Sequence, residues 1–138
     1  MQRRNNIMKR ARRKLTIIIG FILLGIVIVV ADEFDVIAAA MRVGDAHGIA
    51  VHFDKNVDIK TEDKSITYSR NQGELVLREF FHNNMPRAFN IIHRGSSAKG
   101  AMYIIGTLET VHGNYRSFVY VKQISNKDLI EQMSFEKQ

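Results

Sequence analysis

The fold of this chain is decided by residues 89–122, which read FNIIHRGSSAKGAMYIIGTLETVHGNYRSFVYVK. β-Branched and aromatic residues alternate in this stretch, which predicts three consecutive antiparallel strands, Phe89–Gly95, Met102–Thr110 and Tyr115–Lys122. Residues 96–99 and a tight turn at His112-Gly113 connect them. No catalytic signature lies in this stretch.

A two-residue turn also predicts the register of the last two strands. It pairs Glu109 with Arg116, Thr107 with Phe118 and Ile105 with Tyr120. The opposite charges of Glu109 and Arg116, placed directly across the ladder, support this register.

This pairing divides the side chains between two faces of the sheet. One face is aliphatic, and we expect it under the helices: Met102, Ile104, Gly106, Leu108, Ser117, Val119 and Val121. Gly106 is expected to allow a close helix approach. The other face is aromatic and partly charged, and we expect it to point outward: Tyr103, Ile105, Thr107, Glu109, Arg116, Phe118 and Tyr120.

Two short helices are predicted upstream. The first has an apolar face with helical spacing, acidic residues in its first turn and Gly44 at its end: Phe34, Ile37, Ala38 and Met41. Asp45 can cap the second helix, which repeats the spacing with Ala46, Ile49, Ala50 and Phe53.

A small hairpin and a longer helix come next. The hairpin alternates Val57 and Ile59, then Ile66 and Tyr68, with polar neighbours. Ser69 and Gln72 form a capping box that opens the helix, and Asn84 and Pro86 end it. The apolar face of that helix carries Val76, Leu77, Phe80 and Phe81, and a last strand is expected over residues 129–136.

The net charge of +6 is concentrated in the first 14 residues. Seven of the 20 basic residues and none of the 14 acidic residues lie there, so the rest of the chain has a net charge of −1 (13 basic, 14 acidic). This distribution argues against nucleic-acid binding and suits a leader that contacts lipid headgroups and the export machinery.

Residues 1–31 are predicted to be a signal peptide or an N-terminal membrane anchor. A run of 16 residues without a charge, Leu15 to Val30, is at the upper limit of a signal-peptide core and shorter than a typical span. Val29-Val30-Ala31 offers a cleavage site, which we prefer to an uncleaved anchor. Residues 32–138 are then one exported domain in the periplasm or cell envelope, with membrane contact only through residues 1–31. The chain has no cysteine, which excludes disulfides and thiolate zinc sites.

The order of these elements is that of the nuclear transport factor 2-like cone, which is shared with ketosteroid isomerases and limonene epoxide hydrolases. The chain resembles, more specifically, a family of small exported bacterial proteins of unknown function with this fold. The matching residues are Ala38-Ala39-Ala40, Phe53-Asp54, Val57-Asp58, Tyr68-Ser69, Phe80-Phe81, Phe89, His93-Arg94-Gly95-Ser96-Ser97, Tyr103-Ile104-Ile105-Gly106-Thr107-Leu108, Gly113, Arg116, Leu129-Ile130 and Phe135-Glu136-Lys137.

This resemblance implies an α+β fold, in which a curved antiparallel sheet packs against two short N-terminal helices and one longer helix. It also implies a cleaved signal peptide, and it conveys no activity. An isomerase or hydrolase on this fold needs a carboxylate inside the cone, and the aliphatic face of the last two long strands offers none.

Two kinds of function compete. The first is a non-enzymatic binding or interaction module, and the alternative is a small-molecule enzyme of the isomerase or hydrolase type that uses the cone pocket. We assign no catalytic residue, metal ligand or cofactor. His93 and Arg94 are candidate ligand-binding residues, although the following loop leaves open which face His93 occupies.

The aromatic face predicts association. Tyr103, Ile105, Phe118 and Tyr120 are candidates for the interface of a homodimer, because interfaces are rich in aromatic residues. A small apolar ligand or an envelope protein is the other possible partner of this face, and the outer face of a monomer is the simplest reading.

Overall fold

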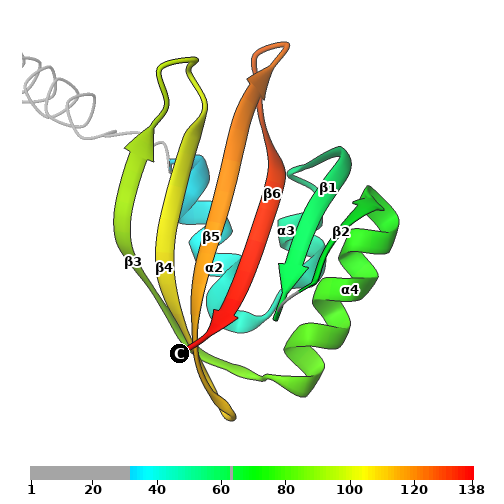
Figure 1. Cartoon of the computed structure of the whole chain (residues 1–138), viewed down its shortest axis with the longest axis vertical. Helices are drawn as coiled ribbons and strands as arrows, with labels where there is room; N and C mark the ends of the chain where they lie inside the picture. The colour runs from blue at the N-terminus through cyan, green and yellow to red at the C-terminus, as the bar shows by residue number, and fades with distance from the viewer. Residues whose placement is uncertain (1–31, 63) are drawn as a thin grey trace, which may run out of the picture. The chain divides into compact units, whose positions relative to one another are not determined.

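The computed structural model of the chain describes residues 32–62 and 64–138, and the predicted leader and its cleavage site lie outside these residues. Within the described residues, three helices and six strands follow the predicted order: α2 (Glu33–Val43), α3 (Ala46–Ala50), β1 (Phe53–Thr61), β2 (Lys64–Ser69), α4 (Arg70–Asn83), β3 (Pro86–Ser96), β4 (Met102–Thr110), β5 (Gly113–Ile124) and β6 (Lys127–Lys137). The α+β class and the cone are confirmed (Figure 1).

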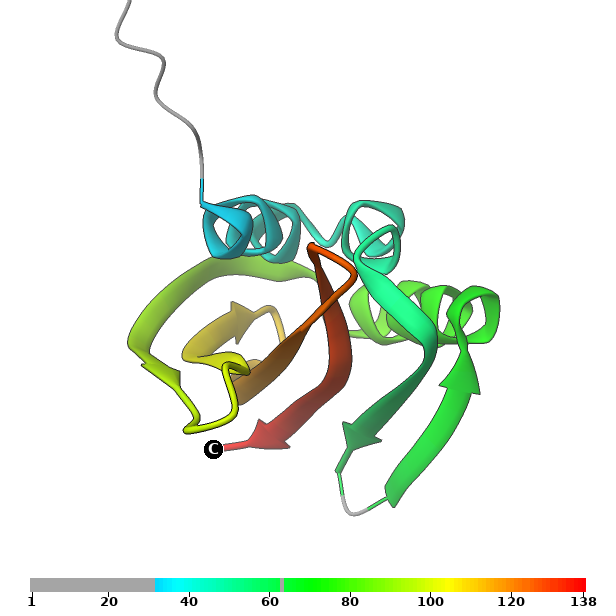
Figure 2. The same cartoon turned by 90° about the horizontal axis from the view of Figure 1, so that it is seen from above.

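The six strands form one curved sheet in the order β2-β1-β6-β5-β4-β3. Neighbouring strands are antiparallel except β1 and β6, which run parallel. The parallel contact joins the N-terminal hairpin to the last strand, a pairing that the sequence pattern did not reveal. The three helices lie side by side along one side of the sheet (Figure 2).

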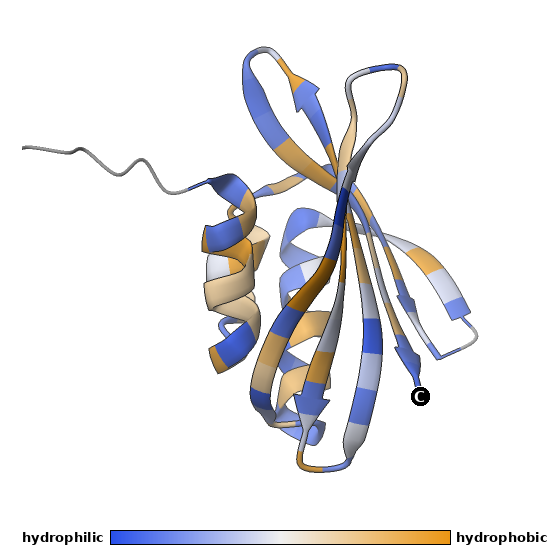
Figure 3. Ribbon diagram, turned by 90° about the vertical axis from the view of Figure 1, so that its left-hand side faces the viewer, coloured by the Kyte–Doolittle hydropathy of each residue, from blue (hydrophilic) through white to orange (hydrophobic). Residues whose placement is uncertain are grey.

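The inner face of the sheet, which packs on the helices, holds the core. Phe34, Ile37, Ala38 and Met41 of α2 are buried there, as their spacing predicts. Hydrophobic and hydrophilic bands alternate along the strands (Figure 3). The residues of the predicted aliphatic face are buried in β4 and β5, except Met102, which is half-buried, and Thr110 and Tyr115 are buried with them. The division of the long strands into two faces is therefore confirmed.

The predicted register of β4 and β5 is wrong by two residues. Arg116 lies opposite Thr107, Phe118 opposite Ile105 and Tyr120 opposite Tyr103. The loop consists of Val111 and His112, because the Thr110 hydroxyl donates to the Gly113 carbonyl (2.8 Å) and accepts from the His112 amide (3.1 Å). A shift of two residues keeps every side chain on its face, so the face assignment survives the error.

Glu109 therefore has a different partner from the predicted Arg116. Its carboxylate accepts a hydrogen bond from the side-chain amide nitrogen of Asn90 in β3 (3.3 Å). Arg116 lies opposite Glu136 of β6 instead.

We expected Gly106 to allow a helix to pack closely against the sheet, but it makes room for a side chain instead. The ring of Phe89, on neighbouring β3, lies over it, and a Cβ at this position would come within 2.5 Å of Phe89 Cζ. Phe89 is 1% exposed. The glycine thus makes room in the inner face for a ring from the next strand.

Helix α4 begins at the predicted capping box. The Ser69 hydroxyl accepts from the Gln72 amide (3.4 Å), and the Ser69 amide donates to the Gln72 side-chain oxygen (3.2 Å). Leu77 and Phe81 are buried on the inner side of the helix, whereas Val76 and Phe80 are partly buried at its margin.

Removing the N-cap should destabilise the domain, because α4 covers β1 and β2. We expect Ser69→Ala to lower the free energy of unfolding by about 1 kcal/mol, the usual cost of a lost N-cap. Urea unfolding followed by circular dichroism measures this. Ser65→Ala, an exposed position on β2, is the control. Equal losses in the two variants would show that the cap does not stabilise the helix.

Candidate functional site

The outer face of the sheet, opposite the helices, carries a continuous aromatic patch. We use the name outer patch for the four predicted interface residues, Tyr103, Ile105, Phe118 and Tyr120. All four side chains are half-buried. The ring centroids of Tyr103 and Phe118 are 5.7 Å apart, and those of Phe118 and Tyr120 are 6.5 Å apart. Ile105 lies directly across the ladder from Phe118. The structure therefore brings the four residues together.

His93 extends this patch onto β3. A bulge between Ile91 and His93 inserts Ile92, which is 65% exposed, and places His93 opposite Ile105. Its ring centroid lies 5.8 Å from that of Tyr103, and its Nε2 is 3.5 Å from the Tyr103 hydroxyl. The bulge reverses the alternation at this point, which explains why the sequence left the face of His93 open.

Arg94 lies on the other side of the sheet and does not join His93. Its guanidinium donates to Asp32 (2.6 Å) and Asp35 (2.5 Å) in the first turn of α2. The hydrogen bond that Arg94 donates to Asp35 raises the pKa of Arg94 above its ordinary value. The structure thus shows Arg94 fixing the start of the domain, and its ligand-binding role stays a prediction.

A charged border flanks the outer patch on the side of β6. Lys60 of β1 donates to Glu136 at 2.8 Å. This hydrogen bond, together with the charge of Lys60, lowers the pKa of Glu136. Arg116 lies across the ladder from Glu136 and lowers that pKa further. The border therefore carries charges of both signs.

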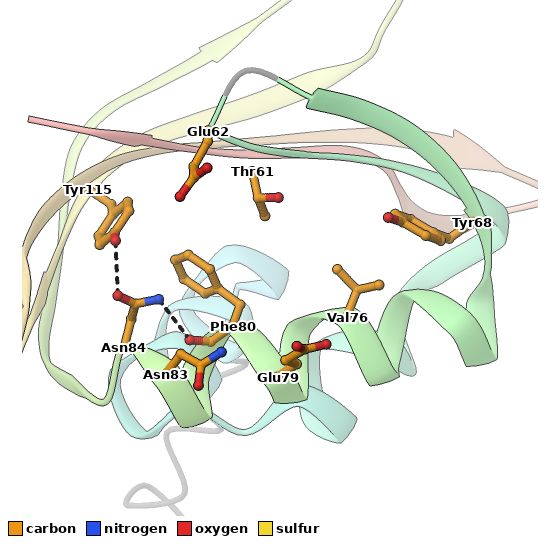
Figure 4. Close-up of a pocket in the computed structure, with 9 residues that line it drawn as sticks. All are labelled: Thr61, Glu62, Tyr68, Val76, Glu79, Phe80, Asn83, Asn84 and Tyr115. Atoms are coloured by element: carbon orange, nitrogen blue, oxygen red, sulfur yellow. Dashed lines mark hydrogen bonds between the residues drawn. The ribbon is translucent and has the colours of Figure 1, made fainter.

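A pocket of about 370 Å³ opens between α4, the end of β1 and the start of β5 (Figure 4). We call it the inner pocket; it is lined by Thr61, Glu62, Tyr68, Val76, Glu79, Phe80, Asn83, Asn84 and Tyr115. The Tyr115 hydroxyl donates to the Asn84 side-chain oxygen (2.9 Å), and the Asn84 amide nitrogen donates to the Phe80 carbonyl (3.1 Å). These two bonds hold the end of α4 against β5.

Sequence reasoning missed the inner pocket, because it looked for polar residues only on the long strands. Ser117, the one hydroxyl residue on the predicted aliphatic face, is buried without a hydrogen-bond partner among the described residues and does not line the pocket. The acidic lining residues come instead from the hairpin loop and from α4. Tyr115, at an inward position at the start of β5, was the one available signal.

Within residues 32–62 and 64–138, no group of three histidine, cysteine, aspartate or glutamate side chains is arranged to hold a metal ion. No helix of the same residues has the length and apolar character needed to cross a membrane.

Residues 34–136 match the model of a domain of unknown function, DUF4783. The chain belongs to the DUF4783 family. Crystal structures of DUF4783 proteins from Bacteroides ovatus and Bacteroides fragilis are similar to this chain, at 25% and 28% identity and TM-scores of 0.72 and 0.71. Each alignment covers 75% of this chain, and they cover 93% and 96% of the crystallised chains.

A designed NTF2-like protein shares the fold at 19% identity and a TM-score of 0.60, with 73% of this chain and 90% of the designed chain covered. No curated protein matches the chain. These comparisons confirm the family and the cone. The matched part is nearly the whole of the crystallised Bacteroides chains.

Removing the charge of Lys60 should raise the pKa of Glu136 toward its ordinary value. We expect this rise in the variant Lys60→Met, measured by NMR titration of the Glu136 carboxyl carbon. Because folding lowers this pKa, the pair stabilises the protein above the ordinary pKa of glutamate, and the stabilisation is lost as the pH falls through the lowered pKa. Lys122→Met is the control, because Lys122 pairs with Glu131. An unchanged Glu136 titration in Lys60→Met would contradict the assignment.

Proposed function

We propose that this DUF4783 protein is a non-catalytic interaction module of the cell envelope, which pairs with a second copy of itself through the outer patch. The observation that carries this proposal is the row of contacting rings on the sheet face that the helices leave uncovered. Contiguous apolar surface of this kind on a soluble protein marks an interaction site.

A second copy suits the outer patch because the patch can pair with itself. A two-fold axis through the sheet face would place Phe118 of each copy at the centre, with Tyr103 and Tyr120 on either side. Aromatic residues at the centre and charged residues at the border are the usual composition of an interface. Arg116 and Glu136 at the border would contribute orientation more than affinity.

The surroundings of the inner pocket support binding over catalysis. Glu62 and Glu79 are exposed to solvent, whereas the isomerases and hydrolases considered above need a carboxylate inside the cone. The hydroxyl of Ser117 lies outside the pocket lining. The alternative, a small-molecule enzyme, therefore has less support in this geometry than an interaction module.

Charging the centre of the outer patch should separate the two copies. We expect Phe118→Glu to give a folded monomer where the wild-type domain is a dimer at micromolar concentration, because two buried glutamates would face each other without partners. Sedimentation velocity measures the change.

Lys64→Glu introduces the same residue at an exposed site on β2 and should leave the dimer intact. A wild-type domain that sediments as a monomer would overturn the dimer. A pull-down of an envelope protein that depends on Phe118 would then identify the other partner considered for this face.

Export is the second part of this proposal, and it rests on the leader sequence. We expect the mature protein to begin at Asp32, because Val29-Val30-Ala31 follows an apolar run shorter than a typical span. Intact-mass measurement of protein recovered from the native envelope tests this. A mass that includes residues 15–30 would show that the leader is not cleaved. The protein would then be anchored in the membrane, with the domain still outside it.

A further inference from the structure

We infer that the inner pocket binds a small organic cation, an ammonium group carried on an apolar or aromatic body. The pocket lies on the helix side of the sheet, whereas the outer patch lies on the opposite side, so this inference does not depend on self-association. It rests on the aromatic floor of the pocket, its unpaired carboxylates and its hydrogen-bond acceptors (Figure 4).

The floor of the pocket is aromatic and held in place. The ring of Phe80 lies between those of Phe135 and Tyr115, with centroid distances of 4.4 Å and 5.2 Å. Phe80 is half-buried, so part of its ring surface remains open to the pocket, and Tyr68 and Val76 complete the apolar lining. An aromatic face attracts a cation through the negative charge of its π-system and also packs against an apolar body.

Two carboxylates line opposite sides of this pocket. Glu62 lies in the hairpin loop after β1 and Glu79 belongs to α4 (Figure 4). Neither makes an ion pair with any residue in 32–62 or 64–138, and no lysine, arginine or histidine lines the pocket.

Three other glutamates of the domain differ from Glu62 and Glu79 because they form ion pairs. Glu74, Glu131 and Glu136 each have a basic partner within 3.3 Å. Lys60, Glu136 and Lys137 line a neighbouring hollow together with Glu62; Lys60 pairs with Glu136, and no ion pair joins Glu62 to either lysine. The inner pocket therefore has a negative charge that is not neutralised by its own walls, which favours a cation and disfavours an anion.

The polar groups of the pocket point to an N–H donor. Because the Tyr115 hydroxyl uses its proton for Asn84, its oxygen remains available only as an acceptor. The Thr61 hydroxyl and the Asn83 side-chain amide, which can both accept and donate, add further acceptors to the lining. A volume of about 370 Å³ is at the small end of ligand sites, so the ligand is a small amine and not a polymer.

The test uses 15N-labelled residues 32–138 and three probes of one shape: benzylammonium, benzyl alcohol and benzoate. We expect saturable amide shifts around Thr61, Val76 and Phe80 with benzylammonium, weaker shifts with benzyl alcohol and none with benzoate. Glu62→Gln and Glu79→Gln should each weaken benzylammonium binding about twofold to fivefold, the range for an exposed ion pair.

Glu109→Gln is the matched control, because it removes the same charge on the outer face and should leave the affinity unchanged. Phe80→Leu should weaken benzylammonium and benzyl alcohol together, since it removes the ring and keeps an apolar side chain. Thermal unfolding of each variant shows that the fold is retained.

Three outcomes would overturn the inference: benzoate binding as well as benzylammonium, shifts that do not saturate, or unchanged affinity in both glutamate variants. The monomeric Phe118→Glu variant should bind benzylammonium like the wild type. Failure of self-association and failure of the inner pocket are therefore distinguishable.

Discussion

The structure depends on burying one face of β4 and β5 under the helices. Alternation in these strands sends Ile104, Leu108, Val119 and Val121 into the core, where each is at most 1% exposed. The same alternation sends every intervening side chain to the opposite face. The side chains of the outer patch therefore share one face because their neighbours along each strand are buried in the core. Since most of these side chains are aromatic, that face is an aromatic surface.

Local exceptions to regular structure place particular side chains in this framework. Gly106 leaves space that the Phe89 ring fills, and Gly73 lets α4 approach β1 so closely that a Cβ would lie 2.8 Å from Val57 Cγ1. The bulge at Ile92 turns His93 toward Tyr103 while Arg94 remains beside α2. Small residues and one inserted residue thus decide which groups meet on each face.

The two faces of the sheet offer different chemistry. The outer face is aromatic with a border of mixed charge, which suits a flat partner such as a second copy. The helix side has a pocket with an aromatic floor and two carboxylates that make no ion pair within the described part of the chain, which suits a small cation. Because the sheet separates them, the self-association and the ligand binding proposed above would use different faces of the domain and would not compete.

The sequence by itself determined the features that depend on near neighbours. The Ser69–Gln72 capping box, the Asp45 cap and the two-residue period of β4 and β5 involve residues close together in the chain, so their chemistry is visible in the letters. The β4–β5 register differs from the predicted one although its cause is also local: the Thr110 hydroxyl bonds to His112 and Gly113 within the turn, and Arg116 lies opposite Thr107 rather than Glu109. Only the tertiary structure decided the face of His93, the parallel contact of β1 with β6, and the inner pocket. The pocket joins residues 61–62, 79–84 and 115, and no local pattern connects segments that meet only through long-range packing.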